Sequence, residues 1–367
     1  MRLRPLSLIL AFAAVLAAAD PGSDWTSVRG NADLTGAATT PLPPGLVKAW
    51  TWDAESSVDG TVVIAGDAVY AATGHGVLAR LDLATGKERW RLVAGPGYTA
   101  GPAISSGTLF IGDNGGELRA VDADTGKERW AIDLKGQINI GATAGSGVVL
   151  ACTEKNRLFC VDMADGKQRW VFTSTNYIRA TTALIGDEAV VAGCDGVLRA
   201  LKLVGGASRT LADAKNFGAP PAHLGPNMIA GSVGSEVLSV ALADGAPRWR
   251  RPAGIDQILV GPAVTATCAV FLGKSGHLIG LDPTTGAERW RTKLDSASLS
   301  APAIAGDLVW IGADDGVLRA FDLATGTERW RWSAGGTIRS GPAIAGGYLV
   351  IGTRDGAVHA LRAPAKP

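Results

Sequence analysis

The sequence predicts an all-β fold, an eight-bladed β-propeller built from four-stranded antiparallel blades. Three observations support this prediction. A motif of the form LRAVDADTGKERW, at Leu118–Trp130, recurs about every 40 residues. Each repeat contains four short apolar runs separated by glycine-centred turns, and no apolar stripe at helical spacing accompanies them. The two ends of the chain hold complementary parts of one further repeat. Four antiparallel strands in a repeat of this length are typical of a propeller blade.

Tryptophan marks the end of almost every repeat. Full copies of the motif occupy Leu78–Trp90, Leu158–Trp170, Leu278–Trp290 and Leu318–Trp330, and a weaker copy ends at Trp249. The tryptophans in phase with the repeat are Trp50, Trp90, Trp130, Trp170, Trp249, Trp290 and Trp330. One copy, Leu198–Thr210, has lost its aspartate and its tryptophan, which would fall near Thr210. Because these residues recur in blade after blade, we interpret them as scaffold that docks neighbouring blades.

The second copy illustrates the strands and turns of one repeat. We expect strands at Thr99–Ile104, Thr108–Ile111, Leu118–Val121 and Glu128–Ile132. Asp122 opens the third turn and can accept backbone N–H bonds, and Gly126 supplies the left-handed conformation of that turn. Trp130 is then expected on the outermost strand, where its ring fills the gap between two blades and its N–H is free to find a partner.

The two ends of the chain are expected to close the ring. Val47–Trp52 has the pattern of an outermost strand without a blade. The C-terminal region offers three strands without a fourth, at Ile338–Ile344, Tyr348–Gly352 and Val358–Leu361. Their pairing completes the eighth blade and leaves no free sheet edge at the junction. The propeller is therefore expected to span residues 47–361, between a proline-containing lead-in segment at 20–46 and a short tail at 362–367.

The repeat motif points to a family. The pattern A-x-D-x-x-T-G-K-x-x-W at Ala120–Trp130 resembles the tryptophan-docking motif of the pyrroloquinoline-quinone (PQQ) type propeller repeat. The resemblance covers roughly Trp25 to Leu361. Quinoprotein alcohol dehydrogenases and the outer-membrane assembly factor BamB, both eight-bladed, belong to that family. The resemblance implies the fold and leaves function open, because enzymes and non-enzymes share the repeat.

The N-terminus predicts export. Residues 1–19 combine Arg2 and Arg4 with an apolar run and a closing Ala-Ala-Ala, which is typical of a signal peptide. The run is too short to span a bilayer. The first cysteine is Cys152, so the lipid-anchored start of BamB-type proteins is not expected. We expect a periplasmic or secreted protein without a membrane span. The net charge of +1 argues against a nucleic-acid partner.

Cysteine and histidine give little indication of redox or metal chemistry. Cys152 and Cys160 flank one predicted hairpin turn and are the one pair that could form a disulfide. The chain has no adjacent Cys-Cys, unlike the quinoprotein dehydrogenases that carry a vicinal disulfide beside their cofactor. The four histidines are scattered without metal-ligand spacing. We therefore assign no catalytic residue and no metal ligand.

Differences between blades mark the candidate site. Aligned on the Pro-Ala step of the innermost strands, the residues three before it are Asp59, Thr99, Asn139, Arg179, Gly218, Leu259, Leu299 and Arg339. The position between this set and the one five before it is mostly apolar, which places both sets toward the central channel. The candidate ligand-binding residues are Arg179, Arg339, Asp59, Asn139, Gln137, Tyr177, Asn216 and Gln257. The two arginines suit a carboxylate; the alternative is a water-filled channel in which they pair with Asp59.

Three functions are consistent with these patterns. The first is a non-catalytic binding or scaffold propeller, similar to BamB, that is monomeric, has no cofactor and binds another periplasmic or envelope protein. The second is a PQQ-dependent alcohol or sugar dehydrogenase with calcium, as the resemblance allows. The third is a ligand-sensing propeller. We favour the first, because the inter-blade loops are short and neither the vicinal disulfide nor a calcium carboxylate set occurs.

Overall fold

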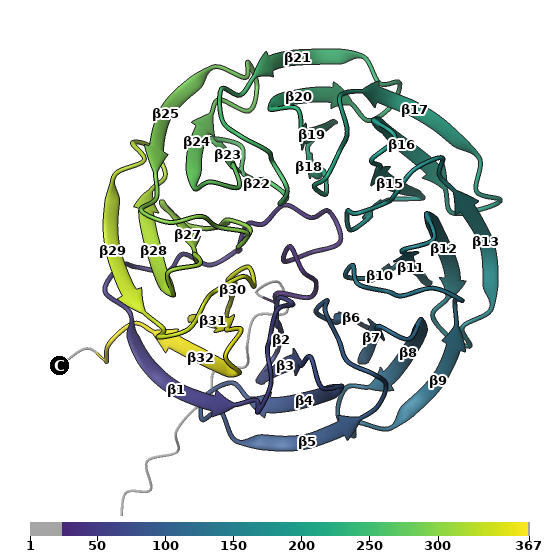
Figure 1. Cartoon of the computed structure of the whole chain (residues 1–367), viewed down its shortest axis with the longest axis vertical. Helices are drawn as coiled ribbons and strands as arrows, with labels where there is room; N and C mark the ends of the chain where they lie inside the picture. The colour runs from purple at the N-terminus through teal and green to yellow at the C-terminus, as the bar shows by residue number, and fades with distance from the viewer. Residues whose placement is uncertain (1–23, 366–367) are drawn as a thin grey trace, which may run out of the picture.

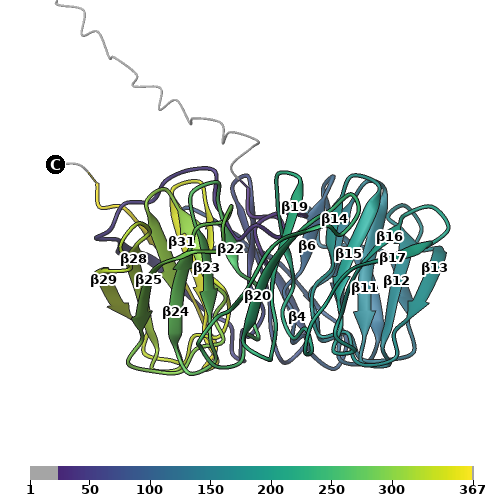
Figure 2. The ribbon, with the colours of Figure 1, turned by 90° about the horizontal axis from the view of Figure 1, so that it is seen from above.

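The computed structural model describes residues 24–365, which form a ring of eight four-stranded antiparallel sheets. Figure 1 shows the blades around a central channel, and Figure 2 shows the ring edge-on as a flat disc. The predicted fold class and blade number are confirmed. No helix occurs among the described residues, hence none long and apolar enough to cross a membrane. The predicted signal peptide, residues 1–19, lies outside the described residues.

Each of the first seven blades is a run of four consecutive strands, ordered from the channel to the rim. They are β2 (Val63–Ala65), β3 (Ala68–Ala72), β4 (Val77–Asp82) and β5 (Glu88–Val93); β6 (Ala103–Ser105), β7 (Thr108–Gly112), β8 (Glu117–Asp122) and β9 (Glu128–Asp133); β10 (Thr143–Gly145), β11 (Val148–Thr153), β12 (Arg157–Asp162) and β13 (Gln168–Thr173); β14 (Ala183–Ile185), β15 (Glu188–Ala192), β16 (Val197–Lys202) and β17 (Ser208–Asp213); β18 (Ala222–Leu224), β19 (Asn227–Gly231), β20 (Glu236–Ala241) and β21 (Pro247–Pro252); β22 (Ala263–Val264), β23 (Ala269–Leu272), β24 (His277–Leu281) and β25 (Glu288–Lys293); β26 (Ala303–Ala305), β27 (Leu308–Ile311), β28 (Val317–Asp322) and β29 (Glu328–Ser333). The eighth blade combines β30 (Ala343–Ala345), β31 (Tyr348–Gly352) and β32 (Ala357–Arg362) with β1 (Val47–Asp53).

The innermost strands are shorter than the sequence predicts. Strand β6 begins at Ala103 rather than at Thr99. Pro102 has no N–H to give to a ladder, and the N–H of Tyr98 donates to the carbonyl oxygen of Thr73 in the preceding blade (3.0 Å). The residues before β6 therefore link two blades instead of extending one.

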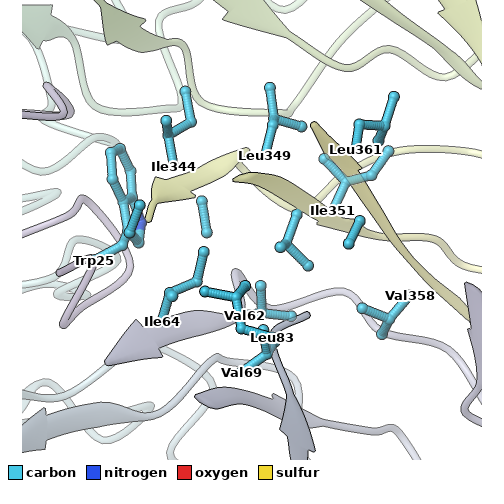
Figure 3. Close-up of a cluster of buried hydrophobic side chains, with 14 of the residues drawn as sticks. Trp25, Val62, Ile64, Val69, Leu83, Ile344, Leu349, Ile351, Val358 and Leu361 are labelled. Carbon is cyan, nitrogen blue, oxygen red and sulfur yellow. The ribbon is translucent and has the colours of Figure 1, made fainter. Parts of the chain in front are cut away.

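The two chain ends meet in the eighth blade, as predicted. Strand β1 pairs antiparallel with β32, and Trp50 lies opposite Ala360. Buried apolar side chains then connect this blade to the first one. Figure 3 shows part of this cluster, with Ile64 and Val62 of the first blade across from Ile344 of the last. The junction between the two ends of the chain is thus a packed core and not an open seam.

Tryptophan docking joins consecutive blades. The indole N–H of Trp290 donates to the carbonyl oxygen of Leu323 in the next blade (2.8 Å). Its ring lies so close to Gly326, which has a φ of +70°, that a Cβ there would collide with it. The motif glycine therefore both turns the chain and makes room for the indole. Equivalent bonds of 2.8–3.1 Å join Trp50 to Leu83, Trp90 to Ala123, Trp130 to Met163, Trp170 to Leu203 and Trp249 to Pro283.

Two junctions depart from this pattern. Among the described residues, Trp330 makes no indole bond to the next blade, because that blade is closed by the chain ends and lacks a motif turn. Its ring packs edge-on against Trp310 of its own blade, with ring centroids 5.5 Å apart. In β17 the bulge is displaced, so that Arg199 lies opposite Thr210. Leu211 is thereby buried and its backbone lies against the next blade, while Thr210 is exposed. The residue that takes the place of the tryptophan is therefore Leu211 and not Thr210.

The disulfide considered for Cys152 and Cys160 is absent. Both thiols are free and buried, as is Cys268, and Cys194 is also free. Cys152 lies opposite Leu158, so the two cysteines occupy diagonal positions on neighbouring strands. Diagonal Cα atoms are about 7–8 Å apart, which exceeds the reach of a disulfide. Burial raises the pKa of the Cys152 thiol to about 12.

Candidate functional site

The lead-in segment crosses the central channel. Figure 1 shows it as the purple chain in the middle of the ring. The backbone N–H groups of Ile64, Ile104, Leu184, His223, Val264 and Ile304, one from each of six innermost strands, donate to carbonyl oxygens between Trp25 and Gly36. An innermost strand presents a free edge of backbone groups to the channel. The lead-in therefore accepts a hydrogen bond from the free edge of the innermost strand in six of the eight blades, and it closes one side of the channel.

Arg29 places a buried positive charge at the side of the channel that the lead-in closes. Its side chain is 1% exposed, and its Nη2 donates to the carbonyl oxygen of Pro262 (2.6 Å). Its Nε and Nη1 have no hydrogen-bond partner among the described residues. The guanidinium lies so close to Gly36 that a Cβ there would collide with it, so this turn of the lead-in is built around the arginine. Burial lowers the pKa of Arg29 to about 9.

A cavity of about 200 Å³ lies beside Arg29. Its walls include the predicted residues Asp59, Thr99, Asn139, Arg179, Leu259, Leu299 and Arg339, and Val28 and Arg29 of the lead-in complete it. Thr99, Asn139 and Arg179 are exposed, so the cavity opens to solvent on the side away from the lead-in. Four of the eight candidate ligand-binding residues are thus brought together around one cavity.

The charges of the cavity pair differently from the alternative considered from the sequence. Arg339 pairs with Asp314 (3.2 Å), and Asp59 pairs with Arg354 of a hairpin turn (2.9 Å). Arg179 lies over the Tyr177 ring, 5.1 Å from its centroid. Neither Arg179 nor Arg339 therefore pairs with Asp59, because the carboxylate of Asp59 is already paired with Arg354.

The other four candidates do not line the cavity. Gln137, Tyr177, Asn216 and Gln257 are exposed. Their backbone carbonyl oxygens accept N–H bonds from hairpin turns, as in the bond from Glu154 to Gln137 (3.0 Å). The apolar residues between the two sets are buried: Val58, Ile138, Ile178, Phe217, Ile258 and Ile338. The predicted alternation is therefore present, but only the set nearer the innermost strands reaches the cavity.

Arg29 was not predicted from the sequence. It lies in the lead-in, outside the repeat, so it has no equivalent position in the other blades, and a comparison of blades cannot identify it. A charged residue between apolar ones in a segment without periodicity is ordinarily solvated. Only the path of the chain through the ring places this side chain in the channel.

The donor set of the cavity does not fit a calcium-bound quinone. Asp59 is the one carboxylate among the lining residues, and it is engaged by Arg354. Calcium takes six to eight oxygen ligands, usually including several carboxylates. No group of three or more His, Cys, Asp or Glu that could hold a metal occurs within residues 24–365. The cavity offers positively charged and amide groups instead.

The outer rim carries a second irregularity. On β5, β25 and β29 a glutamate pairs with an arginine three residues later, as Glu88 does with Arg91 (2.8 Å). On β13 these two positions are Gln168 and Val171, and Val171 is 42% exposed. Val204, 85% exposed, lies in the turn of the next blade that receives the tryptophan of β13. The β13 edge thus lacks the ion pair that β5, β25 and β29 carry, and it exposes apolar side chains.

Comparison with known proteins relates the chain to one family. The family model described as outer membrane protein assembly factor BamB matches residues 74–216 and 233–365. No curated protein matches the chain.

Solved structures share the fold at low sequence identity. BamB from Moraxella catarrhalis is 20% identical, with a TM-score of 0.77 over 87% of this chain and 100% of that one. The computationally designed Ika8 protein is 15% identical, with a TM-score of 0.75 over 88% of this chain and 100% of the design. Quinohemoprotein alcohol dehydrogenase from Comamonas testosteroni is 13% identical, with a TM-score of 0.77 over 95% of this chain and 82% of that one. At these identities the likeness shows the fold alone.

Proposed function

The chain belongs to the PQQ-repeat propeller family of the outer membrane protein assembly factor BamB, and on this basis we propose that it is a non-catalytic scaffold of the cell envelope that binds a partner protein. The family membership supports an envelope role. The surface that carries the proposal is the edge of β13, where the Glu–Arg pair of β5, β25 and β29 is replaced by Gln168 and Val171. A dehydrogenase is not favoured, because the cavity does not fit the calcium-bound quinone.

The β13 edge suits an added strand. β13 pairs only with β12, so its other side presents unpaired N–H and C=O groups that an extended peptide can bond. Charged side chains on an edge oppose such pairing, and β5, β25 and β29 carry them as Glu–Arg pairs. With Gln168 and Val171 at these positions, β13 lacks that protection. Val171 and Val204 offer apolar contacts for alternate side chains of the bound strand.

The test is to install the protective pair on β13. The variant Gln168→Glu/Val171→Arg gives β13 the charges of β5, and Glu88→Gln/Arg91→Val is the matched control that removes them from β5. We expect the mature wild type and the β5 variant to retain one envelope protein in stoichiometric amount after cross-linking at the cell envelope, and the β13 variant to lose it. Purified partner and wild type should then form a complex by themselves. Equal capture by the β13 variant would place the interface elsewhere, and no stoichiometric partner at all would refute the scaffold proposal.

A further inference from the structure

We propose that the channel cavity binds a compact oxyanion, a small carboxylate or phosphate compound, and that Arg29 of the lead-in anchors it. This proposal is independent of the β13 interface, because the cavity lies on the axis of the ring and β13 lies at its rim. It rests on the unpaired donors of Arg29, on the charge balance of the cavity and on its access to solvent.

The unpaired donors of Arg29 are the first argument. A fully buried guanidinium with Nε and Nη1 unsatisfied is unfavourable, because it loses hydration without gaining a partner. Buried cations in proteins are normally paired with a carboxylate or with a bound anion. Arg29 has one bond, to the carbonyl oxygen of Pro262, and it lines the cavity. A bound oxyanion would supply both the missing acceptors and the missing charge.

The charge balance of the cavity is the second argument. Arg179 forms no ion pair among the described residues and lies over the ring of Tyr177. Arg339 is balanced by Asp314, and Asp59 is balanced by Arg354. Arg29 and Arg179 therefore remain as two uncompensated positive charges on one cavity. Asn139 adds a neutral amide that can donate to an oxyanion. The site favours a ligand with one or two negative charges.

Access and size are the third argument. The lead-in closes the side of Arg29, and exposed Thr99, Asn139 and Arg179 form the open side. A ligand would enter from this mouth and reach Arg29 at the closed end. A cavity of about 200 Å³ has room for several water molecules, each of which occupies about 30 Å³ in the liquid. The space beside Arg29 therefore suits a compact acid.

The experiment is isothermal titration of the intact mature protein at low chloride. The probes are inorganic phosphate and succinate, with acetate as a monoanion and glycerol as an uncharged compound. We expect saturable binding of phosphate or succinate with a dissociation constant below about 1 mM, weaker binding of acetate and none of glycerol. The comparison of phosphate with succinate decides which oxyanion the site prefers.

Variants locate the site. Arg179→Gln and Arg29→Lys should each weaken binding by about tenfold or more, as expected for lost charge-assisted bonds. Asp59→Asn should strengthen it, because it removes the one lining carboxylate. Arg248→Gln is the matched control, since this exposed arginine of β21 lies outside the cavity. Arg29→Lys keeps the charge and Arg179 is exposed, so at least one of these variants tests binding in a folded protein, which the melting temperature verifies. The proposal is wrong if no probe binds saturably up to about 10 mM, or if Arg179→Gln and Arg29→Lys bind as the control does.

Discussion

The backbone of Leu211 lies against Gly245, at the junction where the repeat has lost its tryptophan. A Cβ at Gly245 would lie 2.6 Å from the carbonyl oxygen of Leu211. At six other junctions the equivalent glycine lies under an indole ring, and the indole N–H bonds the next blade. Here a displaced bulge brings the main chain itself into the space of the ring. The groove is therefore filled, although the tryptophan is missing.

This packing predicts how the junction responds to substitution. Gly245→Ala should destabilise the protein by more than 1 kcal/mol, because its φ of +76° disfavours a side chain and the new Cβ would clash with Leu211. Leu211→Ala should cost about 2–5 kcal/mol as a buried leucine truncation. Thr210→Trp should add no stability, since Thr210 is exposed. Urea unfolding midpoints measure all three, and a stabilising Thr210→Trp would show that an empty groove exists.

Replacing a docking tryptophan should reduce the stability of the protein most where the indole is buried and hydrogen-bonded to the next blade. Trp290 is 7% exposed and bonds Leu323, so Trp290→Ala should cost about 3–5 kcal/mol. Trp290→Phe keeps most of the ring and loses the N–H bond, and the unpaired carbonyl should cost about 1 kcal/mol or more. Trp330→Ala is the comparison, because Trp330 is half-buried and, among the described residues, makes no indole bond to the next blade. Denaturant unfolding should rank Trp290→Ala well above Trp330→Ala, and equal losses would mean that docking adds nothing.

The sequence specifies the ring well because the repeat carries its own register. The phase of Trp50 with the later tryptophans suffices to predict that β1 closes the last blade, since the C-terminal repeat supplies three strands and no outer strand of its own. The lead-in has no such period, and its position in the channel follows from backbone bonds that any residue could make. For that reason Arg29 could not be found from the sequence, although Asp59, Asn139, Arg179 and Arg339 could. The pairing of Asp59 with Arg354 depends on a turn of another blade, which no alignment of innermost strands contains.

His359 should make stability depend on pH near neutrality. It lies on β32, bonds Thr51 of β1 through Nδ1 (2.9 Å) and packs edge-on against Trp332. Burial lowers the pKa of His359, nearby Lys48 lowers it further and Asp355 opposes this. The unfolded chain therefore binds the proton first, at a pKa of about 6.5, and stability falls as the pH drops below that value toward the folded pKa.

The comparison of pH 7.5 with pH 5 tests this dependence. The wild type should lose stability over that interval, by at most about 1.4 kcal/mol for each unit of pKa difference, and His359→Gln should lose less. The carboxylates affect stability only at lower pH. Arg289 beside Asp282 holds the pKa of that carboxyl at about 2, so the contribution of Asp282 to the free energy of unfolding is lost only below about pH 4. If the wild type and His359→Gln show the same slope between pH 5 and 7.5, His359 is not the responsible group.

Closure of the ring predicts a graded response to N-terminal truncation. A chain that begins at Asp24 keeps every described contact and should melt as a chain that begins at Asp20, after the predicted signal peptide, does. A chain that begins at Val47 keeps β1 but loses the bonds of the lead-in to six innermost strands, so its melting temperature should fall. A chain that begins at Ala54 also loses the pairing of β1 with β32 and the bond from Trp50 to Leu83 (2.8 Å). It should melt lowest and aggregate, because β32 becomes an exposed edge.

Moving β1 distinguishes loss of the strand from loss of the terminus. Val47 lies opposite Arg362 in the register of the closing sheet, so residues 47–53 can be appended after Arg362 through a short Gly/Ser hairpin. In a chain that begins at Ala54, this transferred strand should pair with β32 as before and return Trp50 to Leu83. We expect its melting temperature to match that of the chain beginning at Val47, since both have β1 and lack the lead-in. A transferred strand carrying Trp50→Ala should recover only part of the loss, because the docking bond to the first blade would still be missing. If the chain beginning at Ala54 melted at the temperature of the chain beginning at Val47, the pairing of β1 with β32 would add no stability, and the closed eight-bladed ring would not be the form that the protein adopts in solution.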